Sequence, residues 1–453
     1  MNFSVKMKVS SLYFREEIHL SHNHFIGKLL GIKDKNIKVD ENDWLREDVR
    51  NGLRCKVISA TLTYIPKACK CCGCVNAGSI VKNGMKLTHP LLLDMAGCPT
   101  YLELKKQRFL CRECGQTFIA ETTMVKKRCH ISNDVKHSIA VQGTRNISEK
   151  DIAREHRVSN NTVKRVFGAF YDTFRQTYTH LPENLAIDEF KSVKSADGAM
   201  SLIICDSDSH RIFDILEDRR NKSITDYFLR FPQEQRAKVK TVVVDLYGPY
   251  QKLFQSLFPQ AELIIDRFHI VTQVNRALNM ARIGFMNTLK KANDLKAKRD
   301  YRKLKKYWKL LLKKEDLLNG TEYRYHRLFK SMVTERGIID YLLSLDESLR
   351  LNYNAYQTIV FTVTHRKPDL FRSFIHEKQR GLSAKMDQAL KTFRQSERAI
   401  VNALNYDYSN GLVEGINNKI KVIKRTAYGY RNFSNFRNRI FIEYKLLEIK
   451  TAA

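Results

Sequence analysis

The chain has 453 residues and carries 79 lysines and arginines against 48 aspartates and glutamates, a formal net charge of +31 at pH 7. Its length allows about two to four domains. A globular chain this basic indicates nucleic acid as its partner, with a membrane surface as the lesser possibility. No apolar run approaches the ~20 residues that a bilayer span needs, and the first residues lack the apolar core of a signal peptide. Composition therefore argues against a membrane-spanning protein and predicts a cytoplasmic one.

Cysteines are concentrated in one part of the chain. Residues 1–60 show no pattern that indicates a chemistry, whereas residues 61–130 contain two tight groups of cysteines, each with the pattern Cys-x-x-Cys-Gly. Two residues between the cysteines let both sulfurs face one tetrahedral ion, and the glycine permits a tight turn. In a reducing compartment, clustered cysteines indicate metal ligands before disulfides. We therefore predict a structural Zn²⁺ site, in preference to free or redox-active thiols, with the ligands Cys69, Cys72, Cys111 and Cys114.

Other cysteines offer alternatives to this ligand set. Cys71 and Cys74 form a competing Cys-x-x-Cys pair, which lacks the following glycine. Cys129, next to His130, could also supply a ligand, although a partly buried thiol is the simpler interpretation. The remaining cysteines have no partner pattern and are predicted to be core residues: Cys55, Cys98 and Cys205.

A helix-turn-helix is predicted at residues 148–166, within a mainly helical segment at residues 131–180. Ser148 can cap the first helix and Ser159 the second, whereas Arg157 replaces the glycine that is usual in the turn. The alternative is an ordinary helical hairpin. The predicted packing positions are Ile152, Ala153, Val158, Val163 and Val166, and the predicted DNA contacts on the outer face are Asn160, Asn161, Lys164 and Arg165.

Residues 181–270 alternate between strand and helix patterns, which indicates a mixed α/β sheet. A mainly helical segment, residues 271–405, then interrupts this domain as an insertion, and residues 406–453 return to it. Strands are predicted at residues 185–190, 200–205, 211–216, 239–245 and 262–266, with helices at 224–231 and 250–258.

Three carboxylates are predicted to converge on this sheet. Asp188 lies in the first strand and Asp245 at the end of the fourth, so the two side chains meet if those strands are neighbours. Glu414 lies on a later helix whose apolar face is spaced to pack against the sheet. Three converging acids repel one another unless divalent cations are present, and hard oxygen ligands favour Mg²⁺ or Mn²⁺. Two such ions could activate a water or a 3′-hydroxyl at a phosphodiester.

Each acid also has a simpler interpretation. An aspartate at the end of a strand is usually a turn former or a helix cap, and this alternative is serious for Asp245. Glu189 projects to the opposite face from Asp188 and is a weaker candidate.

Basic residues follow Glu414 closely. Residues 415–439 contain seven lysines and arginines and no acid, and we predict that they position a DNA strand, through Lys421, Lys424, Arg425 and Arg431. A second basic run, residues 290–314, interleaves lysines with leucines, and it is either a solvated helix face or a surface for the DNA backbone.

Several separated segments resemble one known family. Residues 186–189, 244–250, 266–269 and 409–417, together with the aromatic and basic residues 428–433, resemble the DDE transposases of bacterial insertion sequences, most closely the ISL-three family with its N-terminal zinc finger. The resemblance covers about residues 50–445 in the same order. It implies an RNase-H-like core, interrupted by an all-α insertion before the last acid.

The resemblance also implies functional residues and an activity. The family's three catalytic acids fall on Asp188, Asp245 and Glu414. Asp266 and His269 resemble a family signature that arranges the site or contacts DNA, although a strand-end acid with a helix cap is a close alternative. We expect a transposase of the bacterial cytoplasm, associated with the nucleoid, that binds double-stranded DNA at terminal inverted repeats as a homodimer or larger assembly. A metal-dependent nuclease without strand transfer and a DNA-binding regulator on an inactive fold are the alternatives.

Overall fold

The structure, a computed structural model, describes residues 26–27, 30–40, 44–50, 52–292 and 294–451. The chain divides into two compact units, Met1–Arg145 with Glu149–Val166, and Asn146–Ser148 with Phe167–Ala453. Within these described ranges no helix is both long and apolar enough to span a membrane.

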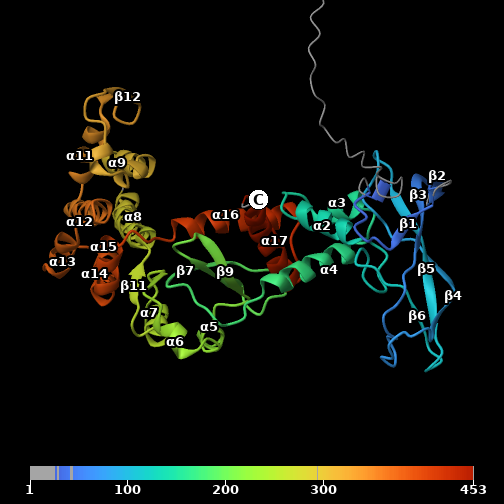
Figure 1. Ribbon diagram of the computed structural model, residues 1–453. Coiled ribbons are helices and arrows are strands. Elements are labelled where there is room, and N and C mark those ends of the chain that lie inside the picture. Colours follow the sequence, from blue (N-terminus) through green and yellow to red (C-terminus); the bar gives the residue numbers. More distant parts are fainter. Residues whose placement is uncertain (1–25, 28–29, 41–43, 51, 293, 452–453) are drawn as a thin grey trace, which may run out of the picture. The chain divides into compact units, whose positions relative to one another are not determined.

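The first unit is built on a six-stranded sheet (Figure 1). Its central strands β3 and β5 pair in parallel, with β1 and β2 on β3 and with β4 and β6 on β5. Residues before position 60, for which the sequence indicated no chemistry, therefore share a sheet with the cysteine segments. Strand β3 also continues across the expected domain boundary at residue 60. The strands are β1 (Ile37–Val39), β2 (Leu45–Arg50), β3 (Leu53–Leu62), β4 (Ile80–Thr88), β5 (Thr100–Cys111) and β6 (Thr117–Ile119).

Three helices follow the sheet, namely α2 (Asn133–Gln142), α3 (Glu149–Glu155) and α4 (Asn160–Tyr171). The Oγ atom of Ser159 accepts the backbone N–H of Thr162 at 3.2 Å and so caps α4 as expected. Arg157, in the turn between α3 and α4, has a φ of 52°, in the left-handed region where a glycine is usual. Ile152, Ala153, Val163 and Val166 are buried, and Val158 is half-buried.

The second unit contains a five-stranded mixed sheet with the order β11-β10-β7-β8-β9. Strands β7, β8 and β9 are antiparallel, whereas β10 runs parallel to β7, and β11 runs parallel to β10. All five predicted strands are present, and this order of three antiparallel and two parallel strands is the RNase-H-like arrangement. The strands are β7 (Asn184–Lys191), β8 (Met200–Asp206), β9 (Arg211–Leu216), β10 (Thr241–Val244) and β11 (Glu262–Ile265).

Helices cover both faces of this sheet. On one face, Val242 and Val244 pack in a core with α5 (Asn221–Phe228) and α7 (Gly248–Leu257). On the other face, Val243 packs in a core with α16 (Gly411–Thr426) and α17 (Phe433–Thr451). Burial on both faces explains the uninterrupted run of valines in β10. A short helix, α6 (Gln233–Ala237), and the 3₁₀ turn η1 (Asp172–Phe174) complete this part.

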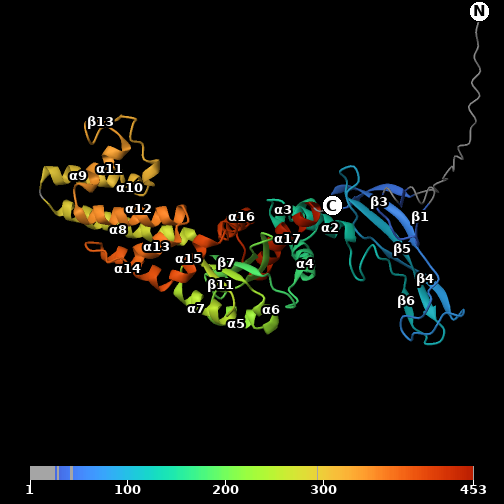
Figure 2. The ribbon, with the colours of Figure 1, turned by 60° about the vertical axis from the view of Figure 1, so that its left-hand side comes forward.

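The insertion is mainly helical and begins with the long helix α8 (Figure 2). Helices α12 and α14 pack along α8, and α15 packs against β11. The expected helical insertion also carries a small hairpin of β12 (Arg324–His326) and β13 (Ser331–Val333), whose three-residue strands are too short to show an alternating pattern. The helices are α8 (Arg267–Lys291), α9 (Leu295–Lys306), α10 (Trp308–Leu311), α11 (Glu335–Leu343), α12 (Glu347–Thr364), α13 (Pro368–His376), α14 (Ala384–Gln395) and α15 (Glu397–Asn405), with a 3₁₀ turn, η2, at Glu315–Leu317.

Candidate active site and zinc site

Asp188 and Asp245 lie on neighbouring parallel strands. Ala186 of β7 pairs with Val243 of β10, so the same register brings Asp188 beside Asp245 just past the end of β10. Burial, followed by the negative charge of Asp245, raises the pKa of Asp188 to about 6. The structure therefore brings these two predicted acids to one place, where their charges oppose each other.

Asp266 and His269 join the same cluster from the start of α8. The side chain of Asp266, directly after β11, accepts the backbone N–H of Phe268 and so caps α8, while burial raises the pKa of Asp266. The Nε2 atom of His269 lies 3.0 Å from Oδ1 of Asp245. This contact is the main cause that raises the pKa of His269. Asp266 is thus a helix cap within the acidic cluster, and His269 contacts one of the predicted catalytic acids.

Helix α16 approaches the cluster through two asparagines. Asn410, at the N-terminus of α16, donates from Nδ2 to the carbonyl of Ile187 at 3.1 Å. Asn417 donates from Nδ2 to Oδ2 of Asp188 at 2.8 Å. Glu414 lies one helical turn before Asn417 and therefore on the same side of the helix. Its carboxylate is exposed and forms no hydrogen bond or ion pair within the described part of the chain.

The packing of α16 agrees with the expected apolar face. Four side chains at helical spacing are buried in the core between α16 and the sheet, namely Val413, Ile416, Ile420 and Ile423. This face fixes the rotation of the helix, so Asn417 points toward β7. Asn410 and Asn417 were not predicted as site residues. The sequence signals for Asn417 were its spacing of three residues from Glu414 and its place in the segment 409–417 that resembles the family.

Glu189 faces another set of partners. Arg219 donates to Oε2 of Glu189 at 2.5 Å, and the hydroxyl of Tyr250 donates to Oε1 at 2.5 Å. This carboxylate is therefore neutralised and held by the chain itself. It is the weaker metal candidate, as its position in the strand indicated.

The donor atoms of the cluster fit a hard divalent cation. They are carboxylate oxygens whose charges are unbalanced, and the buried Oδ1 atoms of Asn410 and Asn417 have no hydrogen-bond partner among the described residues. Unpaired buried oxygens beside repelling carboxylates suit Mg²⁺ or Mn²⁺ better than a thiophilic metal. If the site holds two ions about 3.5–4 Å apart, its carboxylate ligands lie farther from one another than ligands that surround a single ion.

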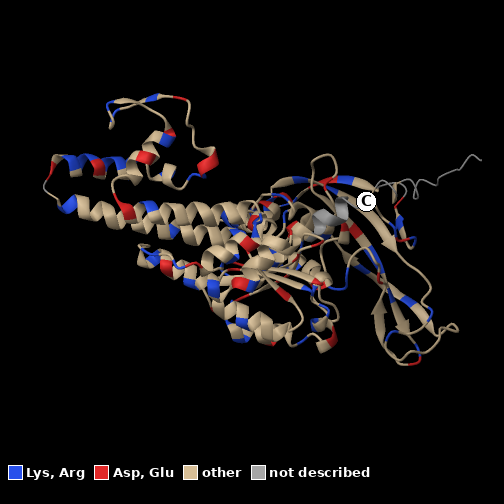
Figure 3. Cartoon of the chain, turned by 90° about the vertical axis from the view of Figure 1, so that its left-hand side faces the viewer, with Lys and Arg blue, Asp and Glu red and all other residues tan. Residues whose placement is uncertain are grey.

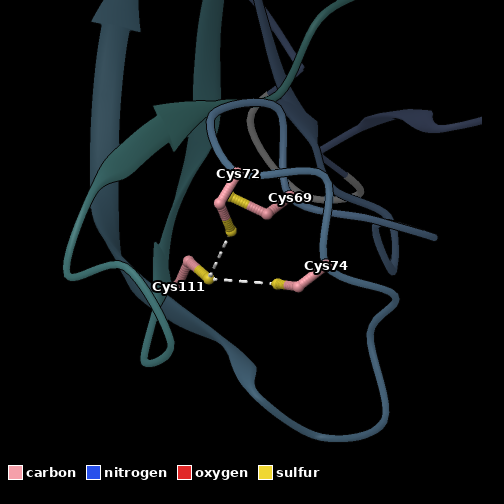
Figure 4. A group of neighbouring side chains, drawn as sticks. All are labelled: Cys69, Cys72, Cys74 and Cys111. Atoms are coloured by element: carbon pink, nitrogen blue, oxygen red, sulfur yellow. Dashed lines mark hydrogen bonds between the residues drawn. The ribbon is translucent and has the colours of Figure 1, made fainter.

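Cysteines form the second candidate metal site (Figure 4). Within the described ranges, they alone provide three or more potential ligands whose donor atoms all lie within 4.8 Å of one another, through Cys69, Cys72, Cys74 and Cys111. The Sγ atom of Cys111 lies 3.9 Å from that of Cys72 and 3.4 Å from that of Cys74. The Sγ atom of Cys114 lies 3.8 Å from that of Cys69. Zinc–sulfur bonds of about 2.3 Å in a tetrahedron separate the sulfurs by about 3.8 Å.

Both Cys-x-x-Cys-Gly segments form the same kind of loop. The backbone N–H groups of Cys72 and Cys71 lower the pKa of Cys69 to about 6, and the N–H of Cys114 is the main cause that lowers the pKa of Cys111. The following glycines adopt positive φ angles, 77° at Gly73 and 67° at Gly115, as their place in tight turns predicts. Three of the four predicted ligands, Cys69, Cys72 and Cys111, lie in one group with Cys74, whereas Cys114 lies 3.8 Å from Cys69 but outside that group.

The other cysteines lie outside this cluster. Cys71 is not one of the four cysteines whose donor atoms all lie within 4.8 Å of one another, so the pair Cys71 and Cys74 does not enter the cluster together. Cys55 and Cys205 are buried as expected for core residues, whereas Cys98 and Cys129 are half-buried.

The predicted DNA-binding side chains differ in their exposure. Lys421, Arg425 and Arg431 are exposed, whereas the ammonium of Lys424 donates to the carbonyl oxygens of Ser192 at 2.5 Å and Lys191 at 3.3 Å. Lys424 therefore ties α16 to the end of β7. In the helix-turn-helix, Lys164 is half-buried and the exposed candidates are Asn160, Asn161 and Arg165.

The fold and the acidic cluster define an RNase-H-like protein of the DDE type. A family model described as a transposase, for DDE transposases of the ISL3 group, matches residues 185–440. A second model, described as the zinc-finger of transposase IS204/IS1001/IS1096/IS1165, matches residues 66–114. The chain therefore belongs to the ISL3 family of DDE transposases, and its cysteine segment is a zinc ribbon.

Two relatives show the extent of the similarity. The chain is 24% identical over 348 residues to the transposase for insertion sequence element IS1001 of Bordetella parapertussis. The aligned region covers 74% of this chain and 79% of that protein. It is 37% identical over 126 residues to a protein of Lactococcus lactis subsp. lactis named ATP-dependent protease, over 28% of this chain and 40% of that protein.

Proposed function

We propose that this transposase binds the terminal inverted repeats of its insertion sequence, cleaves a phosphodiester at each element end and joins the freed 3′ end to target DNA. The observation that carries the proposal is the hydrogen bond of 2.8 Å between Asn417 and Asp188. It joins the helix of Glu414 to the strand of Asp188, next to Asp245. A catalytic role explains why Asp188 lies beside Asp245 with the helix of Glu414 anchored to the same strand, whereas a regulator on an inactive fold does not require this arrangement.

In this proposal Asp188, Asp245 and Glu414 hold Mg²⁺, or Mn²⁺ in its place. The bound cations would polarise the scissile phosphate and lower the pKa of the attacking water. The amide of Asn417 orients the carboxylate of Asp188, and the imidazole of His269 orients that of Asp245. Such contacts to a ligand typically alter metal affinity or activity 10–100-fold.

The two chemical steps balance without an external energy source. In hydrolysis, the water oxygen bonds to phosphorus, the bond from phosphorus to the 3′ oxygen breaks, and that oxygen leaves as a hydroxyl. In strand transfer, this 3′-hydroxyl attacks a phosphorus of target DNA and displaces another 3′ oxygen, so one phosphodiester forms as one breaks. The exposed cations Lys421, Arg425 and Arg431 hold the strand during both steps.

Recognition of the element ends belongs to the first unit. The zinc ribbon, with Cys69, Cys72, Cys111 and Cys114 as proposed ligands, supports the helix-turn-helix that follows it. Because two ends must be joined, the proposed active form is a dimer or larger assembly on DNA, in the bacterial cytoplasm at the nucleoid. The proposed contacts to base edges and phosphates come from Asn160, Asn161, Lys164 and Arg165.

The test uses a duplex that carries the ends of the element encoding this chain. In Mg²⁺, Asp245→Asn is expected to abolish cleavage and leave the Kd for this duplex unchanged, while the exposed control Asp226→Asn keeps both. Unchanged cleavage in Asp245→Asn would refute the catalytic assignment. Wild-type cleavage without joined products would indicate a nuclease, and wild-type binding without any cleavage would indicate a regulator.

A further inference from the structure

Helix α9 and the start of α10 present an unusually basic surface to solvent. Between Leu295 and Leu312 there are eight lysines and arginines, and the single acid, Asp300, is buried. Figure 3 shows lysine and arginine gathered along this helix. We define the α9 stripe as six exposed cations: Lys296, Arg299, Arg302, Lys305, Lys306 and Lys309.

The inner face of α9 is firmly held. Arg282 of α8 donates from Nη1 to the carbonyl of Leu304 at 3.0 Å. Lys303 is buried, donates to Oδ1 of Asp300 at 3.2 Å, and lies 3.8 Å from the ring centre of Tyr341. The rotation of α9 is therefore fixed, so the stripe remains on its outer side.

The stripe has little compensating negative charge: Asp294, the N-cap of α9, interacts electrostatically with Lys296 at one end of it. In the described part of the chain, none of its six cations forms an ion pair with a carboxylate, although other cations of the insertion do, such as Lys313 with Glu335 at 2.5 Å. Arg302 lies three residues from Arg299 and four from Lys306, and like charges at these helical spacings repel each other. A bound polyanion would remove this repulsion.

The dimensions of the stripe fit the backbone of a DNA duplex. Twelve residues of helix α9 span about 18 Å, and duplex DNA carries one phosphate charge per about 1.7 Å of its axis. Interfaces between proteins are depleted in lysine, whereas four of the six stripe cations are lysines. Its chemistry therefore favours phosphates over an acidic protein partner.

We propose that the α9 stripe is a sequence-independent binding site for the phosphate backbone of duplex DNA. The inference rests on the proposed function, in which DNA is the substrate. Contacts of this kind release counterions, so they lower affinity as salt rises, and they carry no information about sequence. The insertion thus holds DNA, while the helix-turn-helix selects the element ends.

The test replaces four cations of the stripe with glutamine, which keeps the helix propensity. The variant is Arg302→Gln with Lys305→Gln, Lys306→Gln and Lys309→Gln in the full chain. Binding to a random-sequence duplex is measured against KCl concentration. The logarithmic salt slope is expected to fall by about 3–4, since each lost phosphate contact contributes about 0.9, and affinity at 0.1 M KCl to fall at least about tenfold.

A matched control removes the same charge from other exposed sites of the insertion. It carries glutamine at Lys367, Lys378, Lys385 and Lys391, which are exposed, and it is expected to keep a salt slope within about one of the wild type. The comparison requires that both variants have the melting temperature of the wild type. If one of them melts lower, the single substitutions that make up that variant are tested in its place.

Three results would overturn the inference. These are an unchanged salt slope in the stripe variant, an equal loss in the control, and a loss of self-association with unchanged DNA binding, which would mean a protein partner. Because the readout is binding alone and is repeated in an Asp245→Asn background, a failure of the stripe is distinguishable from a failure of the catalytic proposal.

Discussion

The carboxylate of Asp188 costs the metal-free protein stability at neutral pH, and Asp188→Asn is expected to remove that cost. Burial, and then the charge of Asp245, raises the pKa of Asp188 from 3.8 to about 6. Because ionisation is therefore less favourable in the folded state than in the unfolded chain, the cost is about 3 kcal/mol above pH 6. The introduced asparagine has one acceptor oxygen, so it loses either the hydrogen bond from the backbone N–H of Glu189 or the one from the amide of Asn417. This loss destabilises the protein by about 1 kcal/mol. The net expected gain is about 2 kcal/mol.

The pH dependence has a definite sign. A carboxyl group whose folded pKa is raised destabilises the protein fully above about pH 6, and this cost disappears as pH falls toward the unfolded value of 3.8. The advantage of Asp188→Asn should therefore be present at pH 7.5 and nearly absent at pH 4. Added Mg²⁺ should stabilise the wild type and not the variant, because in the proposed site the ion binds the folded state through this carboxylate.

The assay is urea unfolding of the full chain in magnesium-free buffer, followed by the fluorescence of Trp308 in a Trp44→Phe background. The exposed carboxylate variant Asp226→Asn serves as the control and should change stability by less than about 0.5 kcal/mol. If Asp188→Asn is less stable than the wild type at pH 7.5, or if its advantage persists at pH 4, the electrostatic reasoning is wrong.

Three further predictions concern metal ligands and their supports. Cys72→Ser combined with Cys114→Ser should lose zinc, measured by atomic absorption, whereas Cys74→Ser should keep one zinc per chain; the reverse would show that Cys74 is the ligand. Asn417→Ala removes the amide that donates to Asp188, the proposed catalytic acid, so its cleavage rate should fall about 10–100-fold at unchanged DNA affinity, and a wild-type Mg²⁺ titration of cleavage would contradict this role. Lys424→Met loses two hydrogen bonds to backbone carbonyls and should destabilise the protein by about 1–2 kcal/mol in urea unfolding, with an unchanged midpoint arguing that the contacts are dispensable.

The elements of the core could be predicted because each has a local cause. Strand β10 (Thr241–Val244) is a run of β-branched residues buried on both faces, and it falls inside the predicted range 239–245. The apolar spacing of Val413, Ile416 and Ile420 predicted the buried face of α16, and the structure confirms it. The RNase-H-like class was implied by short segments in a fixed order, and the strand order confirms it.

Some features had no local cause to reveal them. Residues 37–62 showed no motif, yet they supply strands to the sheet of the zinc ribbon, because strand pairing depends on partners distant in sequence. Arg439 belongs to the basic run by composition, but it is 2% exposed and lies near the buried Glu443. Lys424 is likewise occupied by carbonyls. The number of basic residues in a helical segment therefore does not indicate which of their side chains are exposed to solvent.

The sequence by itself indicated the class of the protein through the resemblance of short motifs, and it indicated the five strands of the RNase-H-like sheet and the spacing of the clustered cysteines, because periodicity and turn chemistry act over a few residues. Only the tertiary structure decided which side chains meet. Asn417 reaches Asp188 across 229 residues of chain, and Cys74 joins Cys69, Cys72 and Cys111. Such contacts depend on how helices and strands pack, and packing is a property of the whole fold.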